Sequence, residues 1–164
     1  MSTGSPGDLA ARAHAVFAAD AATPPALTLR GGNAVDSYDL PPAPDPTLDA
    51  PDEAYLERYA FWALPHLDAA SWRHYLPRLI DYALRNLGEA TPMVIDGLLA
   101  SLRPPDREPP RLASLSAEQE AVVVAVLDVL AFDERSLHRD LAMQVLEEYW
   151  VPNSLYRKRP PTGA

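Results

Sequence analysis

Apolar residues recur every three to four positions along most of this chain, which is the spacing of amphipathic α-helices. The clearest stripe, around Pro77, comprises Leu76, Leu79, Ile80, Ala83, Leu84 and Leu87. Another stripe, which follows Thr91-Pro92, comprises Val94, Ile95, Leu98, Leu99 and Leu102. The pattern predicts an all-α protein, a single compact domain of six or seven helices.

One of these helices is apolar on almost every side. Residues 121–132 include Val122, Val123, Val124, Val126, Leu127, Val129 and Leu130. The β-branched content would also suit a buried strand. However, the length of the run and the preceding Ser116-Ala117-Glu118-Gln119, a capping-box pattern, favour a helix. Because a helix that is apolar all round is buried, we predict it at the centre of the fold.

Further polar residues and prolines predict where helices begin and end. Ser5, Asp68 and Ser136 are suited to cap helices that follow them, because their side chains can accept hydrogen bonds from free backbone amides. Pro77 either separates two helices or kinks one continuous helix. These two alternatives stay open at this point.

The region between residues 26 and 50 is the least regular. Residues 26–29 are compatible with a short extended piece before a turn at Gly31-Gly32-Asn33. Prolines at positions 41, 42, 44 and 46 disfavour a helix, so we expect an irregular proline-rich loop over residues 31–50. Residues 1–152 are thus predicted to form one helical domain, and residues 153–164 a flexible basic tail.

Composition limits the classes of protein that fit. The 164 residues include no cysteine, which excludes disulfides, thiolate metal sites and cysteine nucleophiles. The net charge of −9 disfavours binding to nucleic acid. The N-terminus does not resemble a signal peptide, and no apolar run is long enough to span a membrane. We therefore expect a cytoplasmic protein that binds neither nucleic acid nor a membrane; its oligomeric state stays open.

Seven acidic residues occur between positions 36 and 57, and no basic residue lies among them. They are Asp36, Asp39, Asp45, Asp49, Asp52, Glu53 and Glu57. They form either a solvated loop with a favourable charge at a helix N-terminus, or a surface that binds a basic partner. Changing the aspartates to asparagine is expected to leave the fold nearly as stable, apart from a capping role for Asp49.

Few residues suggest catalysis. His66 with Asp68 and His74 with Asp81 are pairs that could transfer protons. The chain has no G-x-S-x-G nucleophile motif and no His-Glu-x-x-His zinc motif, so no catalytic nucleophile, metal or cofactor is predicted.

Several segments together resemble a known family. They are residues 61–87 with Tyr75-Leu76-Pro77 at the centre, Leu115-Ser116-x-Glu118-Gln119, and a first helix that ends at Pro24-Pro25. This combination, over residues 9–150, is similar to an uncharacterised bacterial family of helical domains of unknown function. The resemblance implies an α-helical domain in a bacterial cytosol and implies no catalytic residue.

These observations favour a non-enzymatic binding protein, similar to an immunity or inhibitor protein, whose acidic surface covers a basic protein such as a nuclease toxin. The alternative is a small metal-independent enzyme that uses a His/Asp pair near residues 66–81.

Overall fold

The computed structural model describes residues 5–90 and 93–157, and all regular structure in these ranges is helical. The α-helices are α1 Pro6–Val16, α2 Ala18–Ala22, α3 Leu29–Asp36, α4 Glu53–Ala63, α5 Ala69–Arg85, α6 Val94–Ser101, α7 Ala117–Phe132 and α8 Arg139–Val145. Two 3₁₀ turns, η1 Leu64–His66 and η2 Leu112–Ser114, and a π-helical turn, η3 Leu146–Trp150, complete the elements. The predicted all-α single domain is confirmed, with eight α-helices in the described ranges rather than six or seven.

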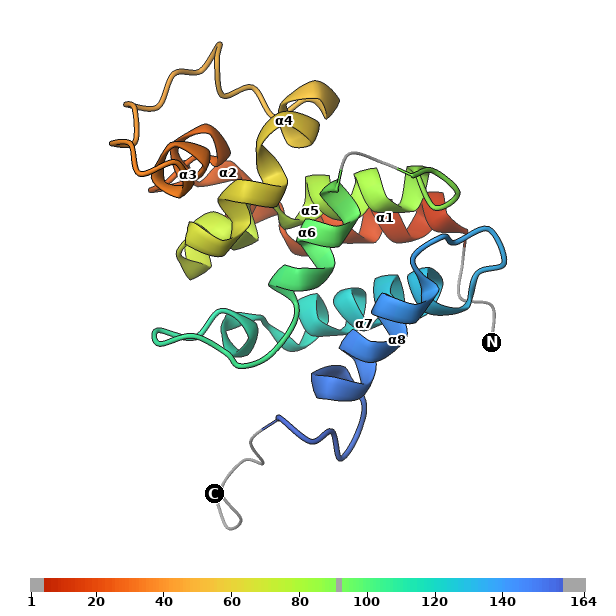
Figure 1. The fold of residues 1–164 in the computed structure, drawn as a ribbon. Coiled ribbons are helices and arrows are strands. Elements are labelled where there is room, and N and C mark those ends of the chain that lie inside the picture. Colours follow the sequence, from red (N-terminus) through yellow and green to blue (C-terminus); the bar gives the residue numbers. More distant parts are fainter. Residues whose placement is uncertain (1–4, 91–92, 158–164) are drawn as a thin grey trace.

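The helices pack around one apolar core (Figure 1). Helix α5 contacts α1, α2, α6 and α7, while α7 contacts α1, α5 and α8. Helices α3 and α4 pair with each other at one end of the molecule, and the irregular segment that joins them lies at the periphery. The prediction of a central, fully buried helix is only partly confirmed: one face of α7, with Val122, Val126 and Leu130, is buried in the core, while Asp128 and Phe132 are exposed.

Helix α5 is continuous through Pro77, which confirms the second of the two alternatives. The side chains of Trp72, Leu76 and Ile80 on either side of the proline are all buried. Burial of this stripe stabilises the helix against the loss of the one hydrogen bond that proline cannot donate. Asp68 accepts a hydrogen bond from the Ser71 amide at 3.3 Å and caps the helix, as predicted.

The predicted turn at Gly31-Gly32-Asn33 is wrong, because Leu29–Asp36 form α3; of the predicted extended piece over residues 26–29, Leu29 lies in this helix and residues 26–28 precede it without regular structure. Thr28 caps this helix through the Gly31 amide at 2.9 Å. The second glycine allows α3 to pack closely on α4, since a Cβ atom at Gly32 would lie 2.8 Å from Cβ and 3.0 Å from Cα of Ala63. The irregular segment therefore begins at residue 37 rather than at residue 31.

Helix α7 begins with the predicted capping box. The Gln119 amide donates to Ser116 Oγ at 3.1 Å, and the Ser116 amide donates to Gln119 Oε1 at 3.0 Å. The same Gln119 side chain donates to the Val16 carbonyl at 3.0 Å and to Asp20 Oδ2 at 2.8 Å. One glutamine thereby fixes the start of α7 against the end of α1 and against α2.

Three predictions near the chain ends need correction or fall outside the described ranges. Ser136 does not cap the last helix: α8 begins at Arg139, and Ser136 Oγ instead donates to the Leu130 carbonyl at 2.5 Å. Part of the predicted flexible tail lies against the domain, because Arg157 pairs with Glu120 and stacks on Tyr149. Residues 158–164 of that tail and the predicted helix start at Thr91-Pro92 lie outside the described residues. Among the helices seen, none is both long and apolar enough to cross a membrane.

Candidate functional site

The two predicted His/Asp pairs are not formed. Asp68 caps α5, and His66 Nε2 instead lies 2.9 Å from Asp36 Oδ1. Asp81 pairs with His14 Nε2 at 2.9 Å and with Arg85, while His74 Nδ1 contacts the Asp20 carbonyl at 3.2 Å. Because α5 is continuous, His74 and Asp81 lie nearly two helical turns apart. None of the four residues therefore pairs with another of the four, and each has a different partner.

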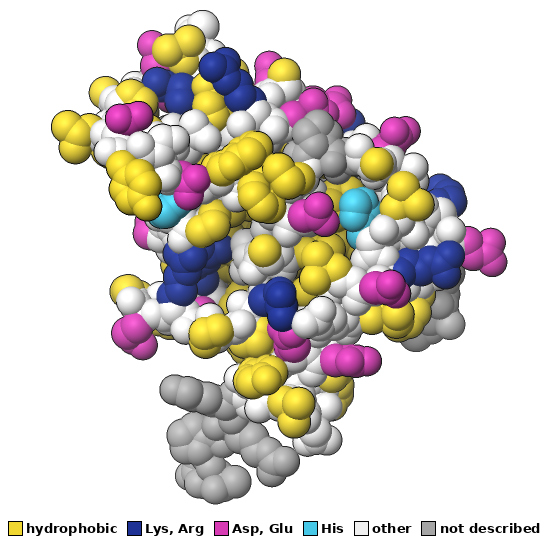
Figure 2. Space-filling model, viewed as in Figure 1, with side chains coloured by type: hydrophobic (Ala, Val, Ile, Leu, Met, Phe, Trp, Pro, Cys, Tyr) yellow, Lys and Arg dark blue, Asp and Glu magenta, His cyan; other side chains and the backbone are white. Residues whose placement is uncertain are grey.

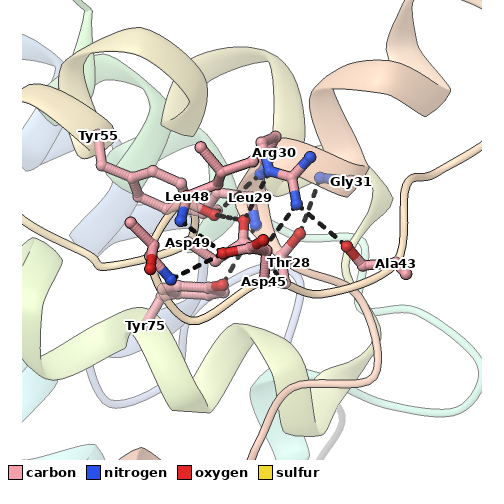
Figure 3. A network of polar contacts seen from close by, with 11 residues as sticks. Thr28, Leu29, Arg30, Gly31, Ala43, Asp45, Leu48, Asp49, Tyr55 and Tyr75 are labelled. Atoms are coloured by element: carbon pink, nitrogen blue, oxygen red, sulfur yellow. Dashed lines mark hydrogen bonds and ion pairs between the residues drawn. The ribbon is translucent and has the colours of Figure 1, made fainter.

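The acidic segment, defined here as residues 36–52, is fastened to α3 by a network around Asp49 (Figure 3). Arg30 donates to this carboxylate through Nε at 3.1 Å and through Nη2 at 2.9 Å. Tyr55 donates to Asp49 Oδ1 at 2.9 Å, and the Asp45 amide donates to Oδ2 at 2.7 Å. Arg30 also donates to the Ala43 carbonyl at 3.1 Å, so one guanidinium binds the segment at two positions, Ala43 and Asp49.

Burial and hydrogen bonding both act on the ionisation of this network. Burial alone would raise the pKa of Asp49, but the bonds from Arg30, from the Asp45 amide and from Tyr55 outweigh it and hold the pKa below the ordinary value. Burial raises the pKa of Tyr55, so the phenol stays protonated and donates. Asp49 is thus a structural carboxylate and is not free to bind a partner.

Most of the other predicted partner-binding acids also have contacts within the chain. Asp45 accepts from the amides of Thr47 and Leu48 and forms a turn. The remaining contacts are Asp36 with His66, Asp52 with the Tyr55 amide as cap of α4, Glu53 with Arg85, and Glu57 with the Tyr82 hydroxyl. Asp39 is exposed, and its side chain forms no hydrogen bond or ion pair within the described chain. Four of the seven acids are exposed: Asp36, Asp39, Asp52 and Glu53. Three of these four also have a partner within the chain, and Asp39 is the exception.

The acidic segment also presents large apolar side chains to solvent, which the sequence did not predict. Tyr38 is 99% exposed, Leu40 is 91% exposed and Leu48 is 58% exposed. The segment that carries them is held in place at Ala43, Asp45 and Asp49, so their exposure is built into the fold. Exposed apolar groups on a fixed segment are typical of surfaces that bind other proteins.

A second feature is an open cleft of about 370 Å³ between the end of α4, α6 and the connection to α7. Apolar and aromatic groups, including Phe61, Trp62 and Pro65, form one wall. On the face shown in Figure 2, hydrophobic side chains gather near the centre and basic side chains border them. The cleft has the size of small-molecule sites in other proteins.

The basic wall of the cleft contains a buried arginine. Arg111 is only 3% exposed; its Nη1 donates to the Leu64 carbonyl at 2.9 Å and approaches the Leu67 carbonyl at 3.4 Å. The guanidinium lies 5.0 Å from the centre of the Trp72 ring. In the described chain no carboxylate lies within ion-pair distance of Arg111. Burial, followed by repulsion from Arg107, lowers the pKa of Arg111 to about 10, so the group keeps its charge at neutral pH.

Asp106 organises the loop that carries both arginines. Its carboxylate accepts hydrogen bonds from the amides of residues 107, 111, 112 and 113, at 2.8 to 2.9 Å. Although burial opposes the effect, these four bonds lower the pKa of Asp106. Because the charge is satisfied by its own backbone, Asp106 acts as the anchor of the loop.

The sequence interpretation treated residues 104–113 as a proline-rich connection and missed this cleft. Four charged residues in ten positions, Asp106, Arg107, Glu108 and Arg111, were the available signal. The pattern shows neither that Asp106 turns onto its own backbone nor that Arg111 is buried. Across residues 5–90 and 93–157, no group of three His, Asp or Glu side chains is arranged to hold a metal ion.

The fold and these two features define a helical domain with a projecting acidic segment and a basic-walled cleft. A comparison with protein families matches residues 6–154 to the Family of unknown function (DUF6714), and the chain belongs to this family. The comparisons with curated proteins and with solved structures found no match. The family assignment confirms the resemblance to an uncharacterised helical domain.

Proposed function

We propose that this is a non-enzymatic binding protein of the cytoplasm whose acidic segment binds a basic protein. The observation that carries the proposal is the exposure of Tyr38, Leu40 and Leu48 on a segment fixed by the Arg30–Asp49 pair. A prearranged segment loses little conformational freedom on binding, which favours affinity. The apolar side chains would supply contact area at the centre of the interface.

Charge supports a basic rather than an acidic partner. The chain carries a net charge of −9, and Asp39 lies between two of the exposed apolar residues. Carboxylates beside an apolar contact raise the association rate of a basic partner and repel acidic ones. The most specific form of the proposal is a bacterial protein that resembles immunity or inhibitor proteins and covers the basic surface of a toxin.

The test uses the protein as an affinity bait in an extract of its native host, with a double variant as the control. The variant is Tyr38→Asn with Leu40→Ser. Asparagine suits position 38 because φ there is 62°, a left-handed angle that asparagine tolerates. A second control, Leu155→Ser, removes an apolar side chain that is 87% exposed outside the acidic segment.

The proposal requires one basic protein that the wild type and Leu155→Ser retain and the double variant loses. Its association rate should fall as salt rises and should fall again in Asp39→Asn, with little change in dissociation. Equal retention by the double variant, or a rate that is independent of salt, would contradict the proposal.

The alternative, a small metal-independent enzyme, has one supporting observation. His66 pairs with Asp36, and Asp36 also lines the cleft. If this pair acts as a base, the protein should hydrolyse p-nitrophenyl acetate faster than free imidazole does, and His66→Ala should remove that activity. A rate equal to that of imidazole, or one that is unchanged by His66→Ala, argues against the enzyme.

A further inference from the structure

The cleft brings two positive charges to one backbone oxygen. Arg107 Nη1 and Arg111 Nη1 both lie 3.4 Å from the Leu67 carbonyl oxygen, and both residues line the cleft. The guanidinium groups of Arg107 and Arg111 carry like charges and repel each other, and the Arg111 group is buried. A carbonyl oxygen carries only a partial charge and cannot neutralise two guanidinium groups.

The acidic groups near the cleft form no ion pair with these two arginines, although Asp106 and Asp68 favour the charged form of Arg111. Asp106 is bonded to four amides of its own loop, and Asp36 is bonded to His66. A third arginine of the cleft, Arg103, already forms an ion pair with Glu148 through two bonds at 3.0 and 2.7 Å. Of the three arginines that line the cleft, Arg107 and Arg111 are therefore the two without a carboxylate partner in the described chain.

The apolar part of the cleft lining suits a flat apolar group. Trp62 is 38% exposed and lies edge-to-face on Phe61, with ring centres 5.3 Å apart. Pro65 and Pro105 add rigid apolar surface beside it. Aromatic rings and prolines bind planar ligands without losing much side-chain freedom.

We propose that this cleft binds a small organic anion that carries a flat apolar group, with Arg107 and Arg111 binding its negative charge and Trp62 contacting its ring. Guanidinium groups bind carboxylate and phosphate through paired hydrogen bonds, so both anions share the required chemistry. Arg111 also bonds the carbonyls of Leu64 and Leu67, which begin and follow η1, and helps to fix that turn. Arg107 is exposed and has only one long contact, so it is the residue to change.

The probe is 8-anilinonaphthalene-1-sulfonate, a flat aromatic anion whose fluorescence rises in apolar sites. Its neutral analogue N-phenyl-1-naphthylamine has the same rings without the charge. Measurements are made on Tyr38→Asn with Leu40→Ser, so that binding to the acidic segment does not contribute. The sulfonate should bind with one-to-one saturation and about tenfold more tightly than the neutral analogue.

Substitutions then separate the charged wall from the apolar wall. Arg107→Gln should weaken the sulfonate about tenfold and leave the neutral analogue unchanged, and Trp62→Ser should weaken both. Arg12→Gln removes an exposed charge on α1 and should change neither. Benzoate and phenyl phosphate are added as competitors, and the better competitor identifies carboxylate or phosphate as the preferred anion. Equal affinity for the two probes, no effect of Arg107→Gln, or failure of both competitors would overturn the proposal while leaving the binding function of the acidic segment intact.

Discussion

Arg30 and Asp49 are nineteen residues apart in sequence and are joined by two hydrogen bonds between a guanidinium and a carboxylate. Their side chains are 17% and 9% exposed, so the pair is largely removed from water. The bonds close a loop that begins at the end of α3 and returns to the start of α4. The shape of the acidic segment therefore depends on this pair.

Replacing Asp49 with asparagine should destabilise the protein by about 2–3 kcal/mol, since it leaves the Arg30 charge partly buried without its partner. Urea unfolding at neutral pH measures the change. Asp39→Asn, in the same segment but exposed, should stay within about 0.5 kcal/mol of wild type. If both variants unfold at the same urea concentration as wild type, Asp49 is not a structural residue.

The two glycines of α3 should respond differently to a methyl group. Gly32→Ala places Cβ against the backbone of Ala63 and should cost about 1–3 kcal/mol. At Gly31 the closest atom, Leu27 Cδ1 at 2.9 Å, belongs to a flexible side chain. Gly31→Ala should therefore cost about 1 kcal/mol less than Gly32→Ala, because the higher helix propensity of alanine favours both variants alike and only the contact differs. Thermal unfolding of the two variants compares them, and the reverse order would mean that α3 and α4 are farther apart.

Ser116→Ala should reduce the free energy of unfolding by about 1 kcal/mol, because the amide of Gln119 loses its acceptor. Ser116→Asp should be close to neutral, because aspartate accepts the same bond and its charge is favourable at a helix N-terminus. Chemical unfolding of both variants tests the cap. If both variants lose the same free energy of unfolding, the Ser116 hydroxyl does not stabilise the helix as its cap.

Acid should destabilise the protein through carboxylates whose pKa values are lowered in the folded state, such as Asp49 and Asp106. A lowered folded pKa contributes stability above the unfolded value, 3.8 for aspartate, and this contribution is lost as the pH falls below it. The midpoint of urea unfolding should thus be lower at about pH 3 than at about pH 6. Asp106→Asn should show a smaller difference between these two conditions. If Asp106→Asn shows the same difference in midpoint as wild type, Asp106 does not contribute to the loss of stability in acid.

Helix periodicity and caps predicted most of the fold. The buried stripe of α6 and the capping box at Ser116 are local patterns, and the structure contains both. The open question at Pro77 was decided by tertiary packing, which keeps α5 continuous. Helix α3 was missed because two adjacent glycines normally favour a turn, while here Gly32 lies within a helix that packs against the backbone of Ala63.

The candidate sites were harder to predict because they depend on contacts between distant segments. The pairing of His66 with Asp36 requires α3 to lie against η1, and no local pattern encodes this. The acidic run was visible in the sequence, whereas the inward position of Asp49 depends on Arg30. The proposed roles of the acidic segment and of the cleft remain predictions for the experiments above.

The bonds from Gln119 to Val16 and to Asp20 have a consequence for the order in which the chain assembles. They span 103 and 99 residues. During synthesis α1 leaves the ribosome well before α5 and α7, the helices that cover Leu9, Ala13 and Phe17. Contacts over such separations slow folding, because a long loop must close before they form. A nascent chain that stops short of α7 therefore has only α5 to cover the apolar face of α1, and part of that face stays in water until α7 is made.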